Sequence, residues 1–497
     1  MKKILLYSAA SLLMFSSCAL NINDNPNYAT GDDVTPDLVL PSAENYIANA
    51  LGDQMFTYAG FFAQYFDQRP EANQYNNLAE LNLDESSNTI DRCYRNIYAG
   101  AFADINDILS KTNVPADIYV CKVLRVWGYQ LLVDNMSDVP YKEALNGSDI
   151  PTPKWDDGKT IFESVLNELD EAEANIGVSS ITMKDPIFKS NVNGWKGFAN
   201  ALRLRIYLRM IDAGIDAAAY TEKVKALVAA NKFFEGDVAF NVFTNAEGQY
   251  NPWYGAFFRL KTLNYVAAHP IVSYYKATND PRINYGILKN SKADEFVGQI
   301  PGAKTVLKDW NGGEWKNANV SSINVEVMKA EPICIFSQSE LQFLIAEVQL
   351  RFNNDPAAAA TAYENGVKAD FASRGMADKA ADFLSGALVD ITNLGSNEDK
   401  LNLIYMQKWV AFFMRNHMEA WSEIRRTDVP KLTSLNAKDV FDKKDGYNPG
   451  EMIVPAVNYI QAGGLAKRIP YPGTARRLNK NTPAEKKMSD PVFWDVK

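Results

Sequence analysis

The sequence predicts an all-α fold of helix pairs with long irregular insertions between them. Apolar residues recur at the i, i+3, i+4, i+7 spacing of a buried helix face, for example in 195–206 and 341–348. Two stretches, 236–336 and 427–497, break this pattern and are rich in Gly, Pro, Asn and aromatic residues. Hydrophobic residues make up 47% of the 497 residues, which is typical of a folded chain.

Charge and composition exclude several classes of function. The formal charge is −9, from 51 Lys and Arg against 60 Asp and Glu, and nucleic-acid binding requires a clustered basic face instead. The chain has only two histidines, His269 and His417, which leaves little room for a zinc site or a histidine-based triad. No phosphate-binding loop or metal-ligand spacing is present, so the sequence predicts no catalytic residue, metal or cofactor.

The first residues predict export and lipidation. Lys2 and Lys3 precede an apolar stretch, 4–15, that is too short to span a bilayer but suits a signal peptide. Small residues then lead to Cys18. We predict a lipoprotein signal peptide over 1–17 and lipid attachment at Cys18, against the alternative of an ordinary secretory signal.

A polar tether is expected to follow the lipidated cysteine, over residues 18–40. It is expected to end in extended structure around Pro36 and Pro41, before a single helical domain over 41–497. The remaining cysteines, Cys93, Cys121 and Cys334, are odd in number and match no metal-binding spacing. They are therefore predicted to be separate buried thiols.

Helical signals follow one another along the chain. They cover 42–60, 94–108, 120–133, 160–169, 195–206, 341–348 and 406–413. Thr160 and Glu163 have the spacing of a capping box, which predicts a helix start at Thr160. The segment 339–372 holds two helical patterns separated by Asn353-Asn354-Asp355-Pro356, and small residues recur in the second. This arrangement resembles a tetratricopeptide unit, and the earlier helices are candidates for degenerate copies.

Two groups of charged residues accompany these helices. Asp134, Asp138 and Glu143 have the appearance of catalytic carboxylates, but we expect them in a turn, bonding backbone amides. Several arginines lie beside apolar helix faces, where a buried guanidinium needs an acidic or carbonyl partner. They are Arg203, Arg205, Arg209, Arg425 and Arg426.

Six blocks in order along the chain resemble the SusD/RagB-like outer-membrane lipoproteins. They are Asp24–Asn27 after the cysteine, Leu132–Leu145 (LVDNMSDVPYKEAL), Pro153–Asp157, Trp195–Arg205 (WKGFANALRLR), Glu419–Thr427 (EAWSEIRRT), and Arg468–Pro472 followed by Asn479. In the second block, Met136-Ser137 replaces the Tyr-Gly pair usual in that family. The resemblance implies a SusD-like fold with tetratricopeptide-like helix pairs.

The resemblance also implies a binding function without catalysis. It implies a lipid-anchored outer-membrane protein, facing the exterior, that captures a nutrient and passes it to a SusC-like TonB-dependent transporter. The nutrient in that family is most often an oligosaccharide, and some relatives capture peptides. The motif blocks mark the scaffold rather than the ligand site.

Aromatic residues outside the helical stripes are the ligand-binding candidates, because sugar rings stack on aromatic faces. The candidates are Gln74, Tyr75, Trp253, Tyr254, Trp310 and Trp315. The competing interpretation is that these rings pack the loops onto the helices. Two other functions stay open: an all-helical glycoside hydrolase, with acids such as Asp309 and Glu314, and a surface scaffold without a small ligand.

Overall fold

The computed structural model describes residues 34–147, 149–460 and 463–496. It begins with one long helical rod, formed by α2 (Pro36–Ala50), the π-helical segment η1 (Leu51–Met55) and α3 (Phe56–Phe62). The prediction of extended structure around Pro36 and Pro41 is wrong, because both residues lie in α2. Pro36 occupies the first turn of α2, where its missing N–H costs nothing, and Pro41 is accommodated in the second turn. Cys18 and the tether before residue 34 lie outside the described residues.

A second rod packs against the first. It consists of α5 (Asp91–Arg95), the π-helical segment η3 (Asn96–Phe102) and α6 (Ala103–Lys111). Glycine permits the close approach of the two rods, because a Cβ atom on Gly100 would lie 2.5 Å from the ring of Tyr46 in α2. Each rod has a π-helical segment, η1 or η3, in its middle, where the helical turn is wider.

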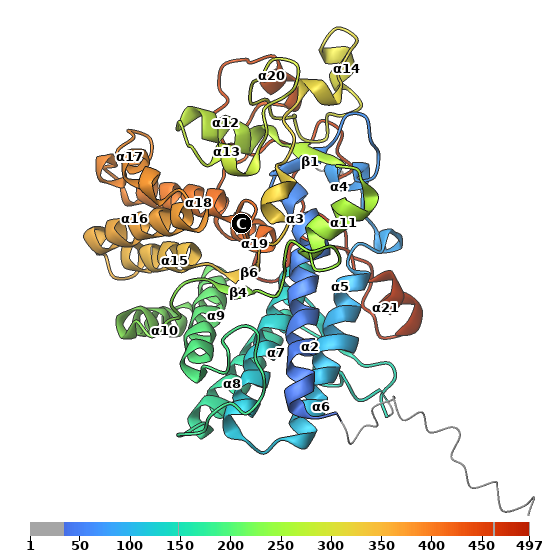
Figure 1. Ribbon diagram of the computed structural model, residues 1–497, viewed down its shortest axis with the longest axis vertical. Helices are drawn as coiled ribbons and strands as arrows, with labels where there is room; N and C mark the ends of the chain where they lie inside the picture. The colour runs from blue at the N-terminus through green and yellow to red at the C-terminus, as the bar shows by residue number, and fades with distance from the viewer. Residues whose placement is uncertain (1–33, 148, 461–462, 497) are drawn as a thin grey trace, which may run out of the picture.

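The predicted helix pairs form most of the remaining scaffold (Figure 1). They are α7 (Pro115–Met136) with α8 (Gly158–Asn175), α9 (Val192–Asp212) with α10 (Ala217–Ala230), α15 (Gln338–Arg351) with α16 (Pro356–Ser373), and α18 (Asn397–Phe412) with α19 (His417–Thr427). The helix pair predicted over 339–372 is confirmed as α15 and α16. Gly366 lets them approach, since its Cβ would meet the ring of Phe343 at 2.8 Å.

Short elements occupy the two irregular stretches. The first holds β4 (Val238–Phe240), α11 (Pro252–Leu260), β5 (Tyr265–Ala267), α12 (His269–Ala277), α13 (Ile283–Gly286), α14 (Leu307–Trp310) and β6 (Ile333–Phe336). The second holds α20 (Ala437–Phe441) and α21 (Gly473–Leu478). Strand β5 pairs antiparallel with β1 (Phe66–Gln68), which joins the first stretch to the end of the N-terminal rod.

Two local predictions need correction. Helix α8 starts at Gly158 rather than Thr160. Asp157 is its N-cap residue, and the Asp157 carboxylate accepts from the Thr160 N–H at 2.9 Å. Asp134 lies inside α7 and not in a turn. Its carboxylate is buried, accepts from the Trp494 indole N–H at 3.0 Å, and forms an ion pair with Arg209.

The arginines of the helix faces are buried and have partners, as predicted. Arg203 pairs with Asp170 and Glu173, Arg205 with Glu340, Arg209 with Asp134 and Glu419, and Arg426 with Asp212, Glu347 and Glu423. Arg425 differs, because its N–H groups donate to the backbone carbonyls of Asp134 and Lys467. These bonds tie α7, α9, α15 and α19 into one scaffold.

Three further expectations concern cysteines, metals and membranes. Cys93, Cys121 and Cys334 are free and buried, which confirms the prediction of separate thiols. Within the described ranges, no group of three or more His, Cys, Asp or Glu side chains is arranged to hold a metal ion. No helix in that part of the chain has the length and apolar character needed to cross a membrane.

Candidate functional site

A pocket of about 470 Å³ opens where the two helical rods meet α11 and the short helix α4 (Asn76–Ala79). This volume lies in the range of roughly 300–1,000 Å³ typical of small-ligand sites. Its wall is mixed, with amide, hydroxyl and charged groups beside the tyrosines Tyr58 and Tyr75. It is lined by Asp53, Gln54, Thr57, Tyr58, Gln74, Tyr75, Asn77, Leu78, Ser87, Asn88, Thr89, Arg92, Ala256 and Leu260. We call it the Tyr75 pocket.

The π-helical segment η1 places two polar residues in this pocket. Asp53 and Gln54 lie in the widened turn, while Thr57 and Tyr58 follow in α3. Insertion of an extra residue into a helix changes which side chains face a given direction, and such segments are common at functional sites. Gly52 allows this turn to lie close to β6, because a Cβ there would meet the Ile333 side chain at 2.6 Å.

Asp53 and Arg92 supply the charge of the pocket. The Arg92 guanidinium lies 2.6 Å from the Asp53 carboxylate. Burial raises the pKa of Asp53, and the positive charges of Arg92 and Arg259 oppose this rise. Arg92 itself is exposed. The pair therefore presents a carboxylate acceptor and guanidinium donors side by side, a combination that suits the hydroxyl groups of a neutral polar ligand.

Tyr75 supplies a half-buried aromatic ring to the pocket. Its backbone N–H donates to the buried Gln68 side chain at 2.6 Å, and its ring contacts Phe61 and Tyr265 at centroid distances of 5.7 and 5.8 Å. The neighbouring Gln74 is exposed, and its side-chain carbonyl accepts from the Asn264 amide. Both predicted residues therefore line one pocket and are held by the β1–β5 region.

Trp253 and Tyr254 lie elsewhere. Trp253 is 2% exposed, and its ring stacks on Phe66 and Tyr265 with centroid distances of 5.8 and 5.3 Å. Tyr254 is also buried, and its hydroxyl donates to Glu326 at 3.1 Å. Their rings are covered by protein, so we do not include them in the binding set. Trp253 instead supports Tyr265, on which Tyr75 rests.

Trp310 and Trp315 are half-buried in a separate small cluster. Both rings contact Phe441 of α20, at 5.6 and 6.1 Å. The Trp315 indole N–H donates to the buried Gln299 side chain at 3.2 Å. Neither residue lines the Tyr75 pocket. Their loop does touch the segment before Tyr75, because the Asn317 N–H donates to Glu71 at 3.1 Å.

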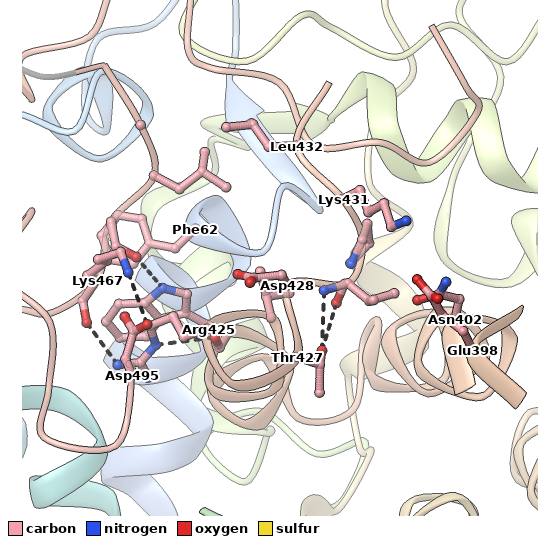
Figure 2. Close-up of a pocket in the computed structure, with 17 residues that line it drawn as sticks. Phe62, Glu398, Asn402, Arg425, Thr427, Asp428, Lys431, Leu432, Lys467 and Asp495 are labelled. Atoms are coloured by element: carbon pink, nitrogen blue, oxygen red, sulfur yellow. Dashed lines mark hydrogen bonds and ion pairs between the residues drawn. The ribbon is translucent and has the colours of Figure 1, made fainter. Parts of the chain in front are cut away.

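A wider pocket of about 620 Å³ lies at the end of α19, and Figure 2 shows its lining. Lys467 and Asp495 occupy one wall and form an ion pair at 3.0 Å, while Glu398 and Asn402 lie on the opposite wall. Burial lowers the pKa of Arg425 to about 10. Its guanidinium is nevertheless engaged with backbone carbonyls of the scaffold. Arg425, Lys467 and Asp495 thus bond mainly to other groups of the protein.

The sequence did not reveal several residues of the Tyr75 pocket. Asp53 and Thr57 belong to the predicted helical segment 42–60, and Arg92 lies outside the predicted helical segments. One signal was available for Asp53, which is the only charged residue in the stretch 45–66. A lone acid inside an apolar helical segment needs a partner, and Arg92 supplies one.

Comparison with known families and structures gives a consistent result. A model of a SusD-like family, described as "Starch-binding associating with outer membrane", matches residues 29–449. No curated protein matches the chain. Among solved structures, one described as a chitin-binding protein is 21% identical, with a TM-score of 0.72, over 93% of this chain and 100% of that chain.

Two structures from Bacteroides are similar as well. A SusD/RagB family protein from Bacteroides thetaiotaomicron has a TM-score of 0.72 at 19% identity, over 93% of this chain and 99% of its own. A SusD homolog from Bacteroides uniformis has a TM-score of 0.69 at 21% identity, over 93% and 100%. At such identities the likeness shows a shared fold.

Proposed function

This chain belongs to the SusD-like family described as starch-binding and associating with the outer membrane, and from that premise we propose that it is a surface protein that binds oligosaccharides. The Tyr75 pocket is the observation that carries the proposal. It combines an aromatic ring, amides and the Asp53–Arg92 pair in a space of about 470 Å³. Sugars use these same contacts, with apolar ring faces on aromatics and hydroxyls on polar groups.

We further propose that the protein delivers its ligand to a SusC-like TonB-dependent transporter and is held at the outer face of the outer membrane by lipid on Cys18. The signal-like segment before Cys18 supports the anchor. Family membership supports the location. Two or more acyl chains are needed for stable anchoring, because one chain binds only marginally.

Changing Cys18 to Ser is expected to release the protein from the membrane fraction. The serine lacks the thiol that would carry the lipid, so the chain would appear in the soluble fraction after cell lysis. Fractionation with immunoblotting measures this distribution, and Cys121→Ser serves as a control with an unchanged anchor. A Cys18→Ser chain that stays with the membrane would contradict lipid attachment at this residue.

A hydrolase is the competing function, with Asp309 and Glu314 as the acids that the sequence offered. A general acid for glycoside cleavage needs a raised pKa. A hydrogen bond from Lys316 instead lowers the pKa of Glu314, which is exposed. Asp309 is exposed too, and neither acid lines the Tyr75 pocket. Asp309 and Glu314 are therefore not placed to act as a catalytic pair at this pocket.

Replacing Tyr75 by Ala is expected to weaken oligosaccharide binding by about two- to tenfold, because one stacked ring contributes roughly 0.5–1.5 kcal/mol. Isothermal titration with malto-oligosaccharides, chito-oligosaccharides and a peptide pool measures the affinity of the domain that lacks residues 1–18. Tyr75→Phe is the matched control and is expected to retain most of the affinity, since it keeps the ring. Equal affinity of Tyr75→Ala and the parent protein would remove Tyr75 from the site.

A further inference from the structure

A second pocket of about 540 Å³ lies directly beside the Tyr75 pocket. Asn88 and Arg92 line both of them, so the two spaces meet at these residues. The second pocket runs between the α5–η3 rod and α21, which lie side by side at the right of Figure 1. It is lined by Asn88, Asp91, Arg92, Tyr94, Arg95, Tyr98, Ala99, Pro151, Pro153, Thr474, Ala475, Leu478 and Asn479. We call it the Tyr98 pocket.

The walls of the Tyr98 pocket are held firmly in place. The Asp91 carboxylate accepts from the backbone N–H groups of Gly473 and Thr474 at 3.0 and 2.8 Å, which fixes the start of α21 on α5. Arg476 makes two bonds of 2.7 Å to Glu85, which add a second tie between α21 and the segment before α5. The pocket therefore exists before any ligand arrives, and binding does not have to order its walls.

The surface of this pocket differs from that of the first. Tyr94 and Tyr98 contribute half-buried rings, with centroids 4.6 Å apart. Leu478 is 78% exposed and adds an apolar side chain to the lining. Arg95 is exposed at the rim. The lining thus offers apolar faces and the guanidinium groups of Arg92 and Arg95, which suits the flat faces and hydroxyl edges of further sugar rings.

Arg92 lies between the two pockets and lines both of them. Its guanidinium is held by Asp53 on the Tyr75 side, while the residue also lines the Tyr98 side. A chain-like ligand that fills the Tyr75 pocket would pass over Arg92 and continue along Tyr98. A compact ligand would end at Arg92.

We propose that the Tyr98 pocket is an extension of the ligand site that selects for chain length, so that the protein prefers long oligosaccharides to short ones. This inference rests on the proposed function of the Tyr75 pocket. It adds a second set of contacts that a chain of two or three sugars does not reach and a longer chain does.

The test blocks the second pocket and leaves the first unchanged. Ala99 is exposed on η3 and lines only the Tyr98 pocket of the two, so Ala99→Trp fills that space from a surface position. Ala219→Trp, at an exposed position in α10, is the matched control. Titration uses maltotriose against maltoheptaose and chitotriose against chitohexaose.

The expected result is a length preference that one variant removes. The parent protein and Ala219→Trp bind the longer member of a series at least tenfold more tightly than the shorter one. Ala99→Trp binds both with the affinity that the parent has for the shorter one. Equal affinity of the parent for both lengths, or an unchanged preference in Ala99→Trp, overturns this inference and leaves the Tyr75 site standing. Absence of binding to every probe overturns the proposed function and the inference together.

Discussion

Replacing Arg426 by Met is expected to lower the free energy of unfolding by about 3–5 kcal/mol at neutral pH, because it leaves buried carboxylates without their main partner. Arg426 is 1% exposed, and its guanidinium lies 2.7 Å from both Glu347 and Glu423. Lys408 remains in the variant but cannot replace the planar bidentate contacts of arginine. Urea unfolding followed by circular dichroism measures the loss.

The loss is also expected to depend on pH. Burial alone would raise the pKa of Glu347, but the charges of Arg426 and Lys408 outweigh it and hold the pKa well below its usual range. A carboxyl with a depressed pKa stabilises the fold above its unfolded-state pKa of about 4.3, and this contribution fades as the pH falls below that value. The difference between parent and variant should therefore shrink from pH 7 to about pH 3.

Arg477→Met is the control for this experiment. Arg477 is exposed at the end of α21, so the same replacement there should change stability by no more than about 0.5 kcal/mol. If Arg426→Met cost less than about 1 kcal/mol at pH 7, the buried ion pairs would not be a net source of stability. The buried arginines of the helix faces would then contribute specificity of packing rather than stability.

Replacing Trp253 by Ala is expected to cost about 3–5 kcal/mol of stability, the usual range for removing a buried aromatic side chain. Its ring stacks on the rings of Phe66 and Tyr265 and meets the ring of Phe56 edge-on at a centroid distance of 5.2 Å. The cavity would lie under Tyr265, which supports Tyr75. Thermal unfolding of the variant and the parent measures the loss.

Trp253→Phe separates packing from ligand contact. It keeps a ring in the stack and is expected to lose less stability than the Ala variant, while its affinity for oligosaccharides stays within about twofold of the parent. A tenfold loss of affinity in a stable Trp253→Phe protein would make this tryptophan a ligand contact. The same titration applied to the parent protein supplies the reference.

The helical scaffold could be predicted from the sequence because its signals are local. The pattern over 339–372 contains both helices and the break at Asn353–Pro356, and the structure has α15 and α16 there. The error at Pro36 and Pro41 arose because proline was interpreted as a break. Pro36 fits the first turn of a helix, and Pro41 is tolerated inside α2. Similarly, Asp157 rather than Thr160 is the N-cap residue of α8, since its carboxylate accepts from the Thr160 N–H.

The ligand site was only partly predictable because it depends on contacts distant in sequence. Tyr75 and Gln74 could be chosen from their irregular polar surroundings. Trp253 has similar surroundings but is buried by Phe66, nearly 190 positions earlier in the chain, a contact that no local pattern reveals. Asp53 and Arg92 likewise come together only because the two helical rods pack side by side.

The three buried thiols have a practical consequence for measuring ligand entry. Burial raises the pKa of both Cys93 and Cys334 to about 12 and that of Cys121 still further, which keeps all three protonated and sheltered at neutral pH. A single cysteine introduced at the rim of the Tyr98 pocket would therefore react with a maleimide dye well ahead of the native ones. Such a reporter could follow capture and release in real time without stripping the protein of its own cysteines.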